Sequence, residues 1–163
     1  MLTQERANEL FEYREDGNLY WKVNRLKKRI GDVVGIETTN GYLRYVIDGK
    51  GYALHRVVWL MHHGVFPKDD LDHIDRNRKN NRIGNLREAS RVQNNGNSSV
   101  PKHNTSGYKG VQWCATSNKW RVCIYKQNKK YWLGRYKTIE EAAKVYHEAA
   151  IEYFGEFAKT SFV

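Results

Sequence analysis

Residues 72–85 read DHIDRNRKNNRIGN, and this stretch is the most informative part of the sequence about the fold. It starts with the adjacent pair Asp72 and His73 and ends at Asn85. The part between them is rich in Asn, Arg and Asp; short Asn and Asp side chains bond to nearby backbone, which favours an ordered loop. We expect Asp72 and His73 at the end of a short strand, then this loop, then a second short strand over 86–89.

Helices are expected on both sides of this stretch. Ser90 with Gln93 three residues later is a capping-box pattern, which starts a helix that carries Asn94 on its first turns. Upstream, residues 55–63 have the pattern of a short buried helix that ends at Gly64, a residue type that tolerates left-handed backbone.

The N-terminal part is expected to be rich in β-structure. Residues 3–12 carry a weak helical pattern, and 19–23 alternate as a strand does. Residues 42–47 suit a strand paired with 52–54 through a hairpin turn. A basic run between these elements is either a solvated loop or an arm that contacts phosphate; its cations are Lys22, Arg25, Lys27, Lys28 and Arg29.

Composition points to a polyanion as partner. The 163 residues carry a formal net charge of +10, and 13% of them are aromatic; charge that serves only solubility is the alternative. The sequence shows neither an apolar run that could span a bilayer nor a signal-peptide core, so we expect a cytoplasmic protein, in the host cell if a phage encodes it. The two cysteines, Cys114 and Cys123, lack further zinc ligands nearby and are expected to be free thiols.

A polar segment over 95–106 marks a domain boundary. Beyond it, three strands are predicted over 108–114, 119–126 and 130–136, with turns at 116–118 and 127–129. Thr138 and Glu141 form a second capping box, which opens a helix. Its predicted inner face consists of Ala142, Ala143, Tyr146, Ala149, Ala150 and Tyr153.

The charge of this last part is divided between the strands and the helix. Residues 106–137 hold eight Lys and Arg and no acid, whereas 138–163 carry a net charge of minus three. Because phosphate attraction dominates affinity for nucleic acid, the sheet is the expected DNA-binding face. Alternation in the second strand predicts that Trp120, Val122 and Ile124 face the helix and that Arg121, Cys123 and Tyr125 face solvent.

The residue types around position 72 suit metal-assisted hydrolysis of a phosphodiester. The carboxylate of Asp72 and the amide oxygen of Asn94 are hard ligands, which favour Mg²⁺ or Mn²⁺. His73 could take the proton from the attacking water. Asn85 cannot usefully transfer protons, so its amide is expected to tie the 74–84 loop to the strand that bears His73. His55 stays open between a structural or phosphate-contacting role and a catalytic one.

Several motif positions and the gaps between them agree together with a known pattern: His55-Arg56, the stretch 72–82, Asn85-Leu86-Arg87 and Asn94. From about Tyr42 to Asn97 the chain resembles the HNH endonucleases, particularly the phage and intron-encoded homing subfamily. The resemblance implies a ββα-metal fold in which Asp72 and Asn94 bind one divalent ion. It also implies that His73 is the general base and that Asn85 is the central asparagine, holding the loop at the catalytic site. Many relatives have histidine at the last motif position, where this chain has Asn94 as the homing subfamily does.

A second family pattern covers the C-terminal part, at Gly107-Tyr108-Lys109-Gly110-Val111, Trp120, Trp132-Leu133-Gly134, Thr138, Glu140-Glu141-Ala142-Ala143, Tyr146, Ala149-Ala150 and Gly155. Over 106–163 the chain resembles the Apetala-type (plant ethylene-response-factor) DNA-binding domain, which implies a three-stranded sheet in the major groove, backed by one helix. By position, the residues that would face DNA are Lys109, Gln112, Arg121, Tyr125, Lys130 and Trp132. Base preference is not carried over, because arginines are usual where this chain has Gln112, Cys114 and Tyr125, and an acid is usual at Cys123.

The sequence therefore predicts an α+β protein. Residues 1–97 would form a β-rich N-terminal part and a ββα-metal nuclease domain with its core over 52–97, followed by a linker over 98–105. Residues 106–163 would form a small three-stranded antiparallel sheet plus one helix. The predicted activity is nicking of double-stranded DNA by a monomer of the HNH homing type that uses one Mg²⁺ or Mn²⁺ ion.

Two other functions agree less well with the sequence. A non-catalytic, sequence-specific DNA-binding regulator is disfavoured by the intact set of Asp72, His73 and Asn94. A basic packaging protein is disfavoured by the two-part organisation.

Overall fold

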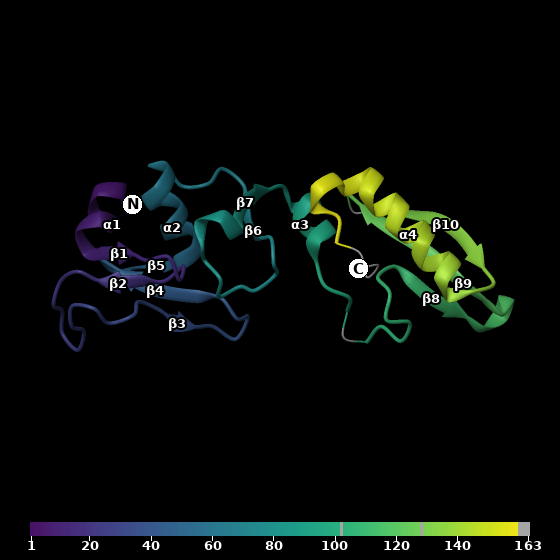
Figure 1. The fold of residues 1–163 in the computed structure, drawn as a ribbon, viewed down its shortest axis with the longest axis horizontal. Coiled ribbons are helices and arrows are strands. Elements are labelled where there is room, and N and C mark those ends of the chain that lie inside the picture. Colours follow the sequence, from purple (N-terminus) through teal and green to yellow (C-terminus); the bar gives the residue numbers. More distant parts are fainter. Residues whose placement is uncertain (102, 128, 160–163) are drawn as a thin grey trace. The chain divides into compact units, whose positions relative to one another are not determined.

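The computed structural model of the protein describes residues 1–101, 103–127 and 129–159. The remaining positions include one residue of the predicted linker, one of the predicted turn at 127–129, and the end of the predicted C-terminal domain. The chain divides into two compact units, Met1–Ala89 and Ser90–Val163 (Figure 1). We call these unit 1 and unit 2.

Unit 1 contains two α-helices, one short 3₁₀ turn and three small antiparallel sheets in its described residues. The sheets pair β1 with β2, β3 with β4 and β5, and β6 with β7. In chain order the elements are α1 (Gln4–Leu10), β1 (Phe11–Tyr13), β2 (Leu19–Trp21), β3 (Ile36–Glu37), β4 (Leu43–Ile47), β5 (Lys50–Ala53), α2 (Leu54–His63), β6 (Asp70–His73), η1 (Ile83–Asn85) and β7 (Leu86–Ala89).

The core of unit 1 forms where α1 packs on β1 and on α2, and where α2 packs on β4 and β5. Thr3 caps α1 by accepting a hydrogen bond from the Arg6 N–H. Helix α2 ends at Gly64, which has φ 77° and so meets the prediction of a left-handed C-cap. The largest side chains buried in this core are Phe11, Leu19, Trp21, Val34, Ile47, Leu54, Val57 and Val58.

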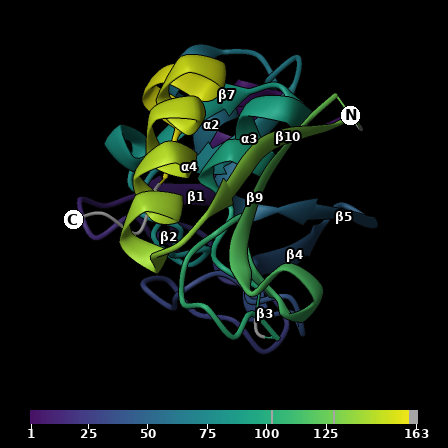
Figure 2. The same ribbon diagram turned by 90° about the vertical axis from the view of Figure 1, so that its right-hand side faces the viewer.

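Unit 2 is a three-stranded antiparallel sheet with α4 lying along one face (Figure 2). The strand order is β10-β9-β8. Four alanines of α4 are buried and let the helix approach the sheet closely. In chain order the elements are α3 (Arg91–Asn97), β8 (Val111–Cys114), η2 (Ala115–Ser117), β9 (Lys119–Lys126), β10 (Lys129–Tyr136), α4 (Ile139–Phe154) and η3 (Gly155–Phe157).

Helix α3 belongs to unit 2, although the sequence suggested the N-terminal domain for it. It starts at the predicted capping box, in which Ser90 accepts from the Gln93 N–H and the Gln93 side chain accepts from the Ser90 N–H. Gly96 is buried, and a β-carbon there would lie 2.8 Å from the ring of Phe154 in α4. The absence of a side chain at Gly96 therefore allows α3 to pack on α4.

The structure combines helices with small antiparallel sheets, as expected for the predicted α+β class, and two local predictions need correction. Strand β8 begins at Val111 instead of Tyr108, because Gly107 and Gly110 have φ values of 76° and 73° and turn the chain. Cys123 was expected to face solvent but is buried. At that point the chain before β8 lies against β9, where the Cys123 N–H donates to the Gly110 carbonyl at 2.9 Å.

No helix in the described residues is long and apolar enough to cross a bilayer.

Candidate active site and nucleic-acid interface

Asp72 is a buried carboxylate on β6, held by an arginine from the neighbouring strand. The β6–β7 register places Arg87 directly opposite Asp72. Arg87 donates from Nε and Nη2 to the Oδ2 atom of Asp72, both at 3.0 Å. Because this ion pair is largely shielded from water, it fixes the position of the carboxylate more firmly than a surface pair would.

His73 ends β6, with its side chain buried and its ring oriented by an asparagine. The ring Nε2 atom lies 3.0 Å from the Oδ1 atom of Asn81, whose side chain is only 2% exposed. An amide oxygen accepts hydrogen bonds, so this contact favours the neutral tautomer in which Nε2 carries the proton and Nδ1 carries the lone pair. Burial lowers the pKa of His73, against the opposing influence of the Asn81 hydrogen bond.

Two further rings surround His73. The rings of His55 and His73 meet edge to face with centroids 5.2 Å apart, and the Tyr42 ring lies 5.2 Å from His55 and 5.9 Å from His73. Burial, followed by the nearby His73 and Arg56, lowers the pKa of His55 to about 3. The buried Nδ1 atom of His55 has no hydrogen-bond partner among the described residues. His55 is therefore a neutral ring packed against the candidate base.

The 74–85 loop is stabilised by a hydrogen-bond network centred on Asp75. Asn85 donates from Nδ2 to the Asp75 Oδ1 at 2.9 Å and to the Asn80 carbonyl at 2.8 Å, and its Oδ1 accepts from the Asp75 N–H at 3.0 Å. Asn80 donates to the second Asp75 oxygen at 2.7 Å. Burial alone would raise the pKa of Asp75, but the hydrogen bonds from Asn80, Asn77 and Asn85 outweigh it and hold the pKa below its usual range. The Asn85 side chain thus joins Asp75 to Asn80 within the loop, and its expected link to the strand that bears His73 stays a prediction.

The N-terminal hairpin supports the same loop from outside. Arg82 donates from Nε to the Glu15 carbonyl at 2.8 Å, and the Tyr13 hydroxyl accepts from the Ile83 N–H at 3.1 Å. Gly17, with φ 86°, approaches so closely that a β-carbon there would lie 2.6 Å from the Arg82 nitrogen. The β1–β2 turn is therefore a brace for the backbone that carries Asn81.

Asn94 stands half-buried on α3 in unit 2, whereas Asp72 and His73 belong to unit 1. Among the described residues, no group of three or more His, Cys, Asp or Glu side chains gathers as a metal site. Mg²⁺ does not need such a group, because it keeps several waters and is usually held by one or two carboxylates together with substrate phosphate.

Three of the six predicted DNA-facing residues form an exposed cluster on the sheet of unit 2. Tyr125 on β9 and Trp132 on β10 are each 59% exposed. The Lys130 ammonium lies 4.1 Å from the Trp132 ring centroid and 5.7 Å from that of Tyr125. An exposed cation between two aromatic faces is the combination that contacts nucleic acid through phosphate attraction and stacking.

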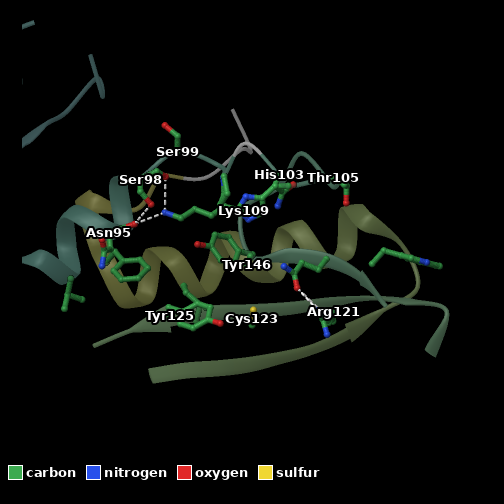
Figure 3. Close-up of a pocket in the computed structure, with 18 of the residues that line it drawn as sticks. Asn95, Ser98, Ser99, His103, Thr105, Lys109, Arg121, Cys123, Tyr125 and Tyr146 are labelled. Atoms are coloured by element: carbon green, nitrogen blue, oxygen red, sulfur yellow. Dashed lines mark hydrogen bonds between the residues drawn. The ribbon is translucent and has the colours of Figure 1, made fainter. Parts of the chain in front are cut away.

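The other three predicted DNA-facing residues line a cavity of about 630 Å³, whose opposite wall comes from residues within 98–101 and 103–105 (Figure 3). Arg121 donates to the Gln112 side-chain oxygen at 2.8 Å. Lys109 donates from Nζ to the carbonyls of Asn95, Gly96 and Ser98 at 2.8, 2.8 and 3.0 Å. In this structure Lys109 therefore satisfies carbonyl groups at the end of α3.

Sequence reasoning placed Asp72 and His73 together but missed the residues that orient them. Arg87 could have been found, because pairing two short strands across the loop sets it opposite Asp72. Asn81 had a weaker signal in the Asn80-Asn81 doublet, since nothing local distinguishes the asparagine that reaches the histidine. His55 was left open, and its ring contact with His73 is visible in the structure alone.

Comparison with known proteins assigns both parts of the chain. Residues 52–96 match the HNH endonuclease family, and residues 106–156 match the AP2 domain family. Over 111 residues the chain is 35% identical to Protein 3.8 of Escherichia phage T7, covering 68% of this chain and 91% of that protein. Over 107 residues it is 37% identical to the uncharacterized HNH endonuclease L560 of Acanthamoeba polyphaga mimivirus, covering 64% of this chain and 54% of the relative. No solved structure matches the chain.

Proposed function

This chain belongs to the HNH endonucleases and carries a C-terminal AP2 domain, and on this basis we propose that it nicks duplex DNA by metal-dependent hydrolysis at His73. One observation carries the proposal. Asn81 fixes the buried ring of His73, and Arg87 fixes the buried carboxylate of Asp72, the residue that precedes His73 on β6.

His73 is the general base of the proposed reaction. With the Nε2 proton committed to Asn81, the Nδ1 atom accepts the proton of the attacking water. The lowered pKa keeps the imidazole neutral near pH 7, which a base requires. A well-placed base of this kind contributes about 10²- to 10⁴-fold in rate. Asn81 and Asn85 are positioning residues, one for the ring and the other for the loop.

Asp72 and Asn94 are the proposed ligands of one divalent ion, Mg²⁺ or Mn²⁺. Both offer oxygen atoms, which fits a hard cation better than zinc. When bound, such an ion stabilises charge on the phosphoryl group and on the leaving 3′ oxygen. Arg87 holds the Asp72 carboxylate in a fixed orientation for this task.

Unit 2 is proposed to hold the duplex through its sheet. Tyr125, Lys130 and Trp132 supply the exposed contacts. Gln112 and Arg121 act as a hydrogen-bonded pair, and Lys109 reaches DNA after release from the carbonyls that it now contacts. Phosphate contact, more than base contact, would set this affinity.

The proposed biological role is that of a homing-type endonuclease of a phage or mobile element, acting as a monomer on DNA in the host-cell cytoplasm. The viral origin of both relatives supports this role. A single active site cuts one strand in one visit, so nicks are the expected product.

Conversion of supercoiled plasmid to the nicked form tests the proposal. Wild-type protein should nick with Mg²⁺ or Mn²⁺ and fail with EDTA. His73→Ala and Asn94→Ala should lose most of the activity, whereas His63→Ala should retain it, because His63 is an exposed histidine on α2. Undiminished nicking by His73→Ala would refute the mechanism. DNA binding without metal-dependent nicking of any substrate would instead favour a non-catalytic regulator.

A further inference from the structure

The basic run between β2 and β3 forms a tight turn with a leucine at its tip. The Arg25 N–H donates to the Lys28 carbonyl and the Lys28 N–H donates to the Arg25 carbonyl, both at 2.9 Å, so Leu26 and Lys27 are the two residues of a hairpin turn. Lys27 has φ 66°, a conformation that usually favours Gly, Asn or Asp. Leu26 is 93% exposed and does not contribute to the core.

Hydrogen bonds hold this turn in an ordered loop. The Asn24 side chain accepts from the Ile30 N–H at 3.1 Å, and the Asp32 side chain accepts from the Arg29 N–H at 2.8 Å. At the base of the loop, the Trp21 N–H donates to the Asp32 carbonyl at 3.0 Å. The loop that carries Leu26 is therefore already ordered, so less conformational entropy is lost when it binds a partner.

Positive charge surrounds the leucine. Residues 22–32 contain five Lys and Arg and one acid, a formal net charge of +4. Arg25 is tied to Asp48, whereas Lys27, Lys28 and Arg29 form no ion pair with the described residues. An open concavity of about 720 Å³ lies beside the tip. Its lining residues are Asn24, Arg25, Lys27, Lys28, Arg29 and Asp32.

A single exposed leucine is ordinary on a protein surface. Leu26 differs because it occupies a turn apex, where it gains no packing, and because cations flank it on both sides. Proteins that kink DNA from the minor groove insert an apolar side chain between two base pairs, which unstacks them, and place basic side chains beside it. Leu26 and its neighbours have this combination. The flanking lysines and arginine would meet the phosphates on either side.

We propose that residues 22–32, here called the arm, bind duplex DNA, with Leu26 inserted between base pairs from the minor groove. This proposal rests on the proposed function, because it takes DNA as the partner. The arm would be a third DNA contact, separate from the active site and from the sheet of unit 2. In Figure 1 the loop between β2 and β3 extends from the side of unit 1 that faces away from β6 and β7. The arm therefore contacts DNA flanking the scissile phosphate, not the cut itself.

Unstacking is measured with duplexes of about 40 base pairs that carry aminopurine at pyrimidine–purine steps, which unstack most easily. Full-length protein is titrated in EDTA, so that no strand is cut. Wild-type protein should raise the aminopurine fluorescence at one or more steps. Leu26→Ala should abolish the rise and weaken binding about tenfold, because an apolar contact of leucine size is lost.

Two further variants distinguish insertion of Leu26 from phosphate attraction and from the loss of any exposed apolar side chain. Lys27→Gln should keep the fluorescence rise but lower the slope of log affinity against log salt by about one. Ile36→Ala removes another exposed apolar side chain of unit 1, 71% exposed and outside the arm, and should change neither signal. Since Leu26 is exposed, its replacement should leave the thermal unfolding midpoint unchanged.

The outcomes are distinct from those of the plasmid assay. Wild-type protein that binds the duplexes without any fluorescence rise, or Leu26→Ala protein that retains the rise, overturns the wedge even if His73-dependent nicking is intact. A Leu26-dependent rise in protein that never nicks would support the wedge and refute the proposed catalysis.

Discussion

Adding a methyl group at Gly17 tests whether the N-terminal hairpin positions the active site. The β-carbon of Gly17→Ala would lie 2.6 Å from the Arg82 nitrogen and 3.0 Å from the Asn81 carbonyl carbon. Both are backbone atoms and cannot rotate away as a flexible side chain would. Ordinary contacts at such a β-carbon lie at 3.4–4 Å, so either the turn or the loop has to move by about 1 Å.

The expected magnitude has two parts. Alanine at φ 86° costs about 1–2 kcal/mol in unfolding free energy from backbone strain alone. The displacement reaches Asn81, whose side chain orients His73 through a 3.0 Å contact. Misplacement of a catalytic group by about 1 Å can cost about 10²-fold in rate. We therefore expect single-turnover nicking to fall by about 10- to 100-fold.

Gly49→Ala is the matched control. Gly49 also has positive φ, 78°, but a β-carbon there would meet nothing within 4 Å. It should lose a similar amount of stability from strain and keep its nicking rate. The assays are thermal unfolding and single-turnover nicking of plasmid at saturating protein. Equal nicking rates for Gly17→Ala and Gly49→Ala would show that the β1–β2 turn does not position the loop that carries Asn81.

Three further predictions concern the site and unit 2. Asn81→Ala should slow single-turnover nicking by about 10²-fold while leaving the Kd for DNA unchanged, because His73 loses its orienting acceptor; weaker binding at an unchanged rate would contradict this. Unfolded His55 takes up a proton below about pH 6.5, but in the folded protein burial lowers its pKa to about 3. As the pH falls from about 6.5 to about 3, the contribution of His55 to the unfolding free energy should thus decrease by about 1.4 kcal/mol per pH unit. Urea titrations over this pH range should find a smaller decrease in His55→Gln. Gly110→Ala would overlap the Tyr146 ring at φ 73° and should destabilise unit 2 by roughly 1–3 kcal/mol or more; an unchanged calorimetric transition would count against that packing.

The elements that the sequence predicted well are those with local signals. The Ser90 capping box and the C-cap at Gly64 are visible in a few neighbouring residues, and both occur as expected. Asp72 and His73 at the end of a strand, followed by an Asn-rich loop, also follow from local chemistry. Helix ends and loop networks are set by hydrogen bonds between residues close in sequence, so they leave their pattern in the chain.

The features that the sequence did not predict depend on distant contacts. Gly17 and Arg82 are far apart in the chain, and their close approach follows from the packing of unit 1. Cys123 was placed on the solvent face by strand alternation, a rule that assumes nothing covers the sheet. Lys109 was assigned to the DNA face by its position in the Apetala-type pattern, and that pattern does not reveal that three carbonyls lie within its reach.

Two sets of cations in unit 1 make different kinds of contact. Arg78, Arg82 and Arg87 lie in or beside the 74–85 loop and donate to the Asn40 carbonyl, the Glu15 carbonyl and the Asp72 carboxylate, respectively. Guanidinium groups committed to such acceptors hold backbone and carboxylate in place. The arm lysines Lys27 and Lys28 form no ion pair with the described residues, so their charge is available to phosphate. The contribution of the arm to the salt dependence of binding should therefore depend on Lys27 and Lys28, whereas the architecture of the active site depends on Arg78, Arg82 and Arg87.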